Sequence, residues 1–143
     1  MNFTQRFVVS AVILLLLGVS AQAQKTPSKR NLGAPIYPNA TFIESFTEGP
    51  VARYLFGSND LTISVRRFYE ARTGKKAERI ESPDGTETYR FVLKGKREAV
   101  LPELEVRVNH FPGGFTIPDE RGETRRYTTT ILISKKMRTR RRR

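Results

Sequence analysis

The chain has 143 residues, no cysteine and a formal net charge of +12. The lack of cysteine excludes disulfides, thiolate metal sites and a cysteine nucleophile, so the fold must depend on its core. The charge does not by itself indicate a nucleic-acid ligand, because residues 31–134 contain 15 basic and 14 acidic side chains. The basic excess lies at the two ends of the chain.

Residues 1–23 have the three parts of a secretory signal peptide. Arg6 supplies the positive region, residues 7–19 form an apolar run of 13 residues, and Ala21-Gln22-Ala23 is a small-x-small cleavage site. A membrane-spanning helix needs about 20 apolar residues, which disfavours a retained anchor. We therefore expect cleavage after residue 23 and an exported bacterial protein that is periplasmic or secreted.

Residues 24–34 are polar and include Pro27 and Gly33, which predicts a flexible lead-in. Residues 35–134 are enough for one hydrophobic core but not for two, so a single domain is expected there. This domain should open with a hairpin of two strands, at residues 41–47 and 51–57.

One amphipathic helix is predicted at residues 60–73. Its apolar stripe follows the spacing i, i+4, i+7, i+8 and consists of Leu61, Val65, Phe68 and Tyr69. Ser58, Asn59 or Asp60 can supply the N-cap. Gly74 then favours the end of the helix.

Alternation with period two returns after the helix. It predicts strands at residues 77–81, 88–94, 104–109 and 125–134. Residues 111–123 contain three glycines and two prolines, which predicts a long loop. The expected fold class is α+β: an antiparallel sheet of five to six strands with one amphipathic helix packed on one face, in the order β-β-α-β-β-β.

The apolar faces of these elements predict ten residues that pack in the core. They are Tyr37, Phe42, Phe56, Leu61, Val65, Phe68, Tyr69, Phe91, Val106 and Ile131.

Two short motifs resemble a known group of proteins. Ile36-Tyr37-Pro38-Asn39-Ala40 precedes the first strand, and Val65-Arg66-Arg67-Phe68-Tyr69 lies in the helix. This resembles a loose group of small bacterial secreted and lipoprotein domains with a Tyr-Pro-Gly-Ala-like entry and a Val-x-x-Phe-Tyr helix, a largely uncharacterised group. Asn39 stands where that group has glycine. The resemblance covers about residues 35–69 and implies an α+β envelope domain with packing roles for the aromatic residues, and no activity.

Few residues suggest catalysis. His110 is the only histidine, and it would need carboxylates such as Asp119 or Glu120 to act as a general base or metal ligand. Glu103 and Glu105 lie two apart on one strand face, as paired carboxylates of a glycosidase can, but alternation more simply makes them a solvated face. We expect no catalytic set, cofactor or metal site.

The last nine residues, 135–143, are predicted to be a disordered polybasic tail. The basic residues are Lys135, Lys136, Arg138, Arg140, Arg141, Arg142 and Arg143. For an exported protein, the anionic partners are envelope surfaces such as membrane headgroups or lipopolysaccharide; an unknown protein partner and a tail that only aids solubility stay open. No aromatic residue interleaves the tail, which disfavours nucleic-acid stacking.

These features predict an exported, non-catalytic envelope or extracellular domain with a binding or structural role. Its basic tail would contact anionic surfaces. The alternatives are a small exported hydrolase that uses His110 with loop carboxylates, and an extracellular nucleic-acid binder.

Overall fold

The computed structural model describes residues 26–118 and 122–138. Three features predicted from the sequence lie outside the described residues: the signal peptide, the loop carboxylates Asp119 and Glu120, and the arginines at positions 140–143.

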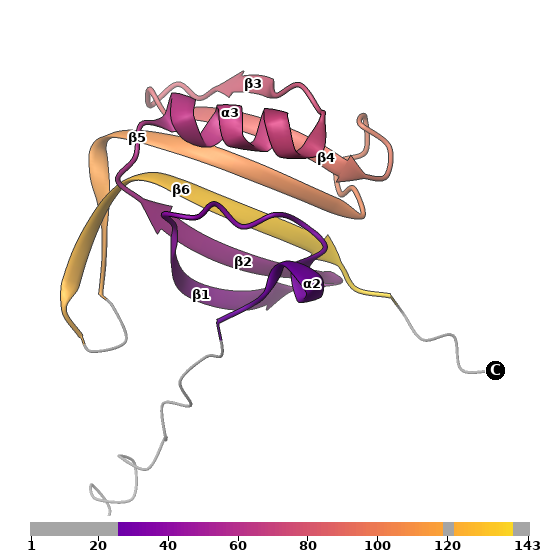
Figure 1. Cartoon of the computed structure of the whole chain (residues 1–143), viewed down its shortest axis with the longest axis horizontal. Helices are drawn as coiled ribbons and strands as arrows, with labels where there is room; N and C mark the ends of the chain where they lie inside the picture. The colour runs from indigo at the N-terminus through magenta and orange to yellow at the C-terminus, as the bar shows by residue number, and fades with distance from the viewer. Residues whose placement is uncertain (1–25, 119–121, 139–143) are drawn as a thin grey trace, which may run out of the picture.

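The described residues form a mostly antiparallel sheet of six strands with two helices, which is consistent with the α+β class (Figure 1). In chain order the elements are α2 (Lys29–Leu32), β1 (Thr41–Glu48), β2 (Val51–Ser58), α3 (Thr62–Thr73), β3 (Glu78–Glu81), β4 (Glu87–Lys94), β5 (Leu104–Pro118) and β6 (Thr124–Lys136). The strand order across the sheet is β1-β2-β6-β5-β4-β3. A hairpin is thus followed by α3 and by a four-stranded meander whose last strand returns to pair with β2.

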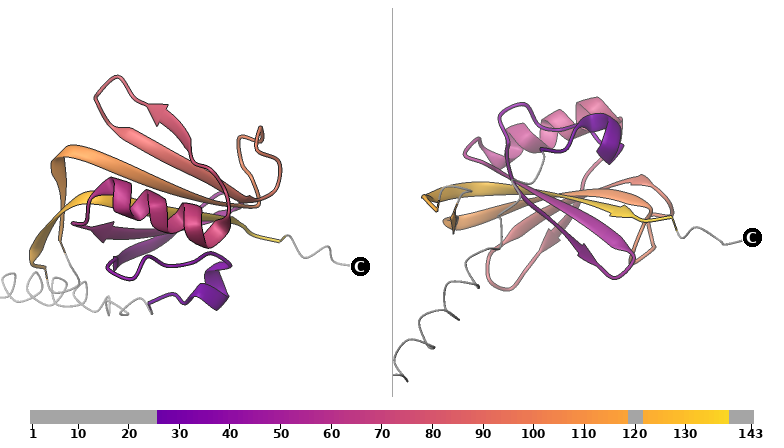
Figure 2. Two further views of the ribbon diagram at one scale, coloured as in Figure 1. Left: turned by 45° about the horizontal axis from the view of Figure 1, so that its top comes forward. Right: turned by 90° about the horizontal axis from the view of Figure 1, so that it is seen from below.

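One face of the sheet is covered by α3 and by the segment that contains α2 (Figure 2, right). Beneath them, Phe56, Ile131 and Val108 lie side by side on three neighbouring strands, because the register pairs them directly. All three are buried. The other face carries no helix within residues 26–118 and 122–138, and its side chains alternate with those of the core.

The start of α3 differs from the prediction. The helix begins at Thr62, and Leu61 stands at the N-cap with an extended backbone (φ −57°, ψ 133°) and no side-chain cap. Leu61 is therefore off the apolar stripe and 73% exposed, so its predicted place in the core is wrong. Ser58 does not cap the helix, because its hydroxyl accepts a hydrogen bond from the backbone N–H of Asp60 (3.1 Å).

The other nine predicted core residues are at least partly buried. Seven lie in the buried cluster, and two pack against it from partly exposed positions, Phe42 and Phe68. Edge-to-face ring contacts connect Phe68 to Tyr37 and to Tyr69, with centroids 5.3 Å and 5.1 Å apart. The aromatic residues of the entry segment and of the helix therefore pack against each other, as the resemblance implies.

The predicted lead-in is folded at its C-terminal end. Residues Lys29–Leu32 form the short helix α2, which ends at Gly33 with a left-handed backbone (φ 74°). Leu32 and Ala34 are completely buried in the core. The sequence did not predict this because Leu32 is a single large apolar residue among polar neighbours, and such a pattern does not indicate burial.

The predicted loop at residues 111–123 is also largely a hairpin. Strand β5 continues through Pro118, and its pairing with β6 is interrupted by a register shift between His110 and Phe115. Gly113 and Gly114 lie within this irregularity, and Arg126 donates a hydrogen bond to the carbonyl of Gly113. Figure 1 shows this hairpin turning away from the rest of the sheet.

Candidate functional site

Two cavities in the described part of the chain open at the same end of the sheet. The register places Val51 opposite Lys136 and Leu104 opposite Lys135, so β2 and β5 begin where β6 ends. Strand β4 ends there too, since Lys94 pairs with Leu104. Four basic residues and one glutamate line each cavity. We call this region the basic end.

The larger cavity is an open groove of about 1,230 Å³, called here the basic groove. Its lining is Leu32, Gly33, Ala52, Tyr54, Lys94, Glu103, Leu104, Lys135, Lys136, Met137 and Arg138. The partly exposed Ala52 and Tyr54 form an apolar floor together with Leu104, which is 8% exposed, and Met137 is 44% exposed. The groove therefore combines an apolar floor with basic side chains.

The end of β6 is held in place beside this groove. The backbone N–H of Lys136 donates to the carbonyl of Glu103 (2.9 Å), and that of Met137 donates to the carbonyl of Pro50 (2.8 Å). The ammonium of Lys135 donates to the carbonyl of Asn31 in α2 (2.7 Å). Lys135 and Lys136 thus belong to the sheet, and the predicted boundary of the disordered tail is too early.

Most of the positive charge in the groove is not neutralised. Lys94 lies 3.2 Å from Glu103, but both side chains are more than half exposed, and such a pair contributes about 0–1 kcal/mol. Among the described residues, Lys135, Lys136 and Arg138 have no ion-pair partner. Three cations are therefore available to an anionic ligand.

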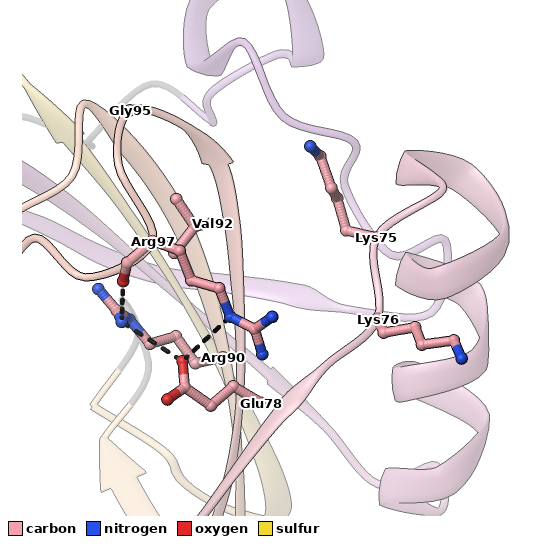
Figure 3. A pocket seen from close by; sticks show the side chains of 7 residues that line it. All are labelled: Lys75, Lys76, Glu78, Arg90, Val92, Gly95 and Arg97. Atoms are coloured by element: carbon pink, nitrogen blue, oxygen red, sulfur yellow. Dashed lines mark hydrogen bonds and ion pairs between the residues drawn. The ribbon is translucent and has the colours of Figure 1, made fainter.

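The smaller cavity, called the Arg90 pocket, has a volume of about 230 Å³. Its lining is Lys75, Lys76, Glu78, Arg90, Val92, Gly95 and Arg97. Figure 3 shows the two lysines on the segment after α3, across from a cluster of Arg90, Arg97 and Glu78. Glu78 lies 3.5 Å from Arg90 and 4.0 Å from Arg97, so the one acid is already engaged by two arginines.

Arg90 is the centre of a buried charge network on the sheet face that has no helix. Its Nε donates to Glu105 (2.8 Å), and its two terminal nitrogens donate to the carbonyls of Arg97 (3.0 Å) and Ala99 (2.8 Å). Glu105 is only 3% exposed and also forms an ion pair with Arg107 (2.9 Å). The network fastens the connection from β4 to β5 over the sheet.

This network does not fit the glycosidase hypothesis. Glu105 is buried between Arg90 and Arg107, so its expected place on a solvated face is wrong. Glu103 is exposed and faces Lys94 instead. Alternation along one strand could not reveal this, because the arginine that covers Glu105 comes from the neighbouring strand.

His110 lies among hydroxyl groups near the start of α3. Its Nδ1 is 3.1 Å from the hydroxyl of Thr62, which is 2.9 Å from the hydroxyl of Thr129. Thr129 in turn donates to the carbonyl of Asp60 (3.2 Å). His110 lines neither cavity, and no group of three potential ligands in the described part of the chain could hold a metal ion.

Asp60 connects the entry segment to the region before α3. The hydroxyl of Tyr37 donates to its carboxylate (2.6 Å), as does the amide of Asn39 (2.9 Å). These hydrogen bonds hold the pKa of Asp60 below its ordinary value, and the bond to Asp60 raises the pKa of Tyr37 to about 12. This carboxylate therefore has a structural role.

The sequence indicated the basic residues at the end of β6 but not those of the other connections. Lys75, Lys76, Lys94 and Arg97 come from the ends of α3 and β4. In an antiparallel sheet, alternate connections lie at the same end. Basic residues that recur after every second element were the signal that could have revealed the cluster.

No protein-family model matches this sequence, and comparisons with curated proteins and with solved structures give no significant match. No helix in the described ranges is long and apolar enough to cross a membrane. The basic end is accordingly the feature from which a function can be proposed.

Proposed function

We propose that the protein is an exported, non-catalytic domain that binds an anionic surface of the cell envelope through its basic end. The observation that carries the proposal is the basic groove, where Lys135, Lys136 and Arg138 have no acidic partner among the described residues. The signal-like N-terminus supports export. Membrane headgroups and lipopolysaccharide are the surfaces that such a site would meet.

The position of these cations makes the contact directional. Basic residues near an anionic membrane contribute about 1 kcal/mol each, and the contribution falls as salt increases. Lys135 and Lys136 are fixed by the strand, so they would present the same end of the domain to the surface each time. The four arginines at residues 140–143 follow directly in the sequence and add to the attraction.

Vesicle binding tests the proposal. The chain from Gln24 onward should bind phosphatidylglycerol vesicles, and binding to phosphatidylcholine vesicles should be much weaker. Replacing Lys135, Lys136 and Arg138 with glutamine should weaken binding about 100-fold at low salt, from three contributions of about 1 kcal/mol each. The effect should shrink as the salt concentration rises.

A matched control removes the same charge elsewhere. It replaces Arg67 on α3 and Arg125 and Arg126 in the β5–β6 hairpin with glutamine. This control should bind vesicles almost as well as the unchanged chain. Equal losses in the two triple variants would refute a directional contact, and tighter binding to single-stranded DNA than to vesicles would replace the envelope with nucleic acid as the partner.

A further inference from the structure

The geometry points to a more specific ligand, and we propose that the basic groove binds one anionic lipid molecule. The acyl chain would lie on the apolar floor, and the headgroup would meet the basic residues at the end of β6. This inference rests on the proposed envelope contact and names the ligand class of the same site.

The apolar floor of the groove indicates a ligand with an apolar part, because a ligand bound by charge alone would not need it. Leu104 is 8% exposed and lines the bottom of the groove, while the fully buried Leu32 anchors the α2 wall beside it. Ala52 and Tyr54 extend this surface along β2, and Met137 adds a half-exposed thioether side chain. An acyl chain would cover this apolar surface, whereas a headgroup alone would leave it in contact with water.

The groove is large enough for a lipid, and its wall on the α2 side is held in place. Its volume of about 1,230 Å³ exceeds the roughly 300–1,000 Å³ of most small-molecule pockets. The wall formed by α2 is fixed, because Leu32 anchors it in the core and Lys135 bonds to Asn31. The site is therefore largely formed before a ligand arrives.

Charge complementarity selects an anionic amphiphile over other occupants. Lys135, Lys136 and Arg138 have no acidic partner within the described ranges, so a neutral apolar ligand would leave them unmatched. A soluble polyanion would match them but would not use the apolar floor. A phospholipid combines one phosphate charge with an acyl chain and satisfies both parts of the groove.

Binding of a monomeric lipid separates this inference from surface attraction. The probe is 1-palmitoyl-lysophosphatidylglycerol below its critical micelle concentration, measured by calorimetry with the chain from Gln24 onward. It should bind at least 10-fold tighter than glycerol phosphate, which lacks the chain, and than lysophosphatidylcholine, which lacks net charge. Equal affinity for lysophosphatidylglycerol and glycerol phosphate would overturn the inference.

Two variants test the floor itself. Ala52→Leu fills the groove and should weaken lysophosphatidylglycerol binding at least 10-fold. Met137→Ser should weaken it about 5-fold, and it keeps the test valid if Ala52→Leu disturbs folding, because Met137 is 44% exposed. Val100→Ser is the matched control, since Val100 is 87% exposed and does not line the groove.

The outcomes distinguish the two proposals. Unchanged affinity in both floor variants would overturn the lipid site, even if the vesicle experiment succeeds. Loss of monomer binding in the floor variants, with normal behaviour of Val100→Ser, would support it. If monomers bind but vesicles do not, the surface contact is wrong and the lipid site stands.

Discussion

The buried network around Arg90 gives a sharp test of how the basic end is held. In the variant Glu105→Gln, Arg90 keeps its carbonyl partners and Glu78 but loses the carboxylate at 2.8 Å. Removing one partner of a buried ion pair costs about 3–5 kcal/mol. Because Arg90 keeps other partners, we expect the lower value, about 3 kcal/mol.

Urea denaturation measures this loss. With a denaturant slope of about 2 kcal/mol/M, the midpoint should fall by about 1.5 M. Glu103→Gln is the matched control, because Glu103 is exposed and its ion pair with Lys94 lies in solvent. The control should change the free energy of unfolding by less than about 0.5 kcal/mol.

Arg90→Lys extends the test to the hydrogen bonds. A lysine ammonium cannot span Glu105 and the carbonyls of Arg97 and Ala99 as the guanidinium does, so stability should fall as in Glu105→Gln. Similar midpoints for Glu105→Gln and Glu103→Gln would refute the reasoning, since they would mean that burial of the pair has no energetic effect.

Two further predictions concern packing and pH. Gly57→Ala should destabilise the domain by about 1–3 kcal/mol in urea denaturation, because a Cβ there would lie 2.5 Å from the ring of Tyr127, while Gly113→Ala, where the added Cβ meets no atom within 4 Å, should be close to neutral. Asp60 has a lowered pKa, so its stabilising contribution should be present above pH 3.8 and lost as the pH falls further; Tyr37→Phe should show a smaller acid loss in the same assay. The raised pKa of Tyr37, about 12, predicts a second loss in alkali: the unchanged chain should lose stability between pH 10 and 12, and Tyr37→Phe should lose less, the rest coming from Tyr69, whose burial also raises its pKa.

Period-two alternation predicted the sheet well because β4, β5 and β6 of the meander each have one face in the core, while the edge strand β3 is largely exposed. Val106 and Ile131 follow this rule directly, and both are fully buried. The alternation rule failed for Glu105, because its ion-pair partner Arg90 lies on the neighbouring strand β4. Glu105 looked solvent-facing from its own strand, but Arg90 and the β4–β5 connection cover it.

The segments misread from the sequence have local signals that tertiary contacts override. Glycines and prolines at residues 111–118 indicate a loop, yet pairing with β6 continues on both sides of the irregularity. Leu61 has helical spacing with Val65, but the helix begins one residue later, so spacing alone could not place its side chain. Leu32 is a single apolar residue in a polar stretch, too weak a pattern to indicate burial.

The near-neutral body of the chain contains a cluster of basic residues that becomes visible only with the strand topology. The connections at one end of the sheet carry the lysines and arginines of the two cavities. The opposite end is mixed in charge: Asp60, Glu81, Asp84 and Glu87 lie there, but Arg79 pairs with Glu81 and Glu87, and the β5–β6 hairpin adds Arg125 and Arg126. In the proposed function, an anionic surface would attract the first end, whose Lys135, Lys136 and Arg138 have no acidic partner among the described residues, more strongly than the mixed second end. Net charge alone would give attraction without orientation, whereas the clustered cations of the basic groove would turn that end toward the surface, which the two triple variants test.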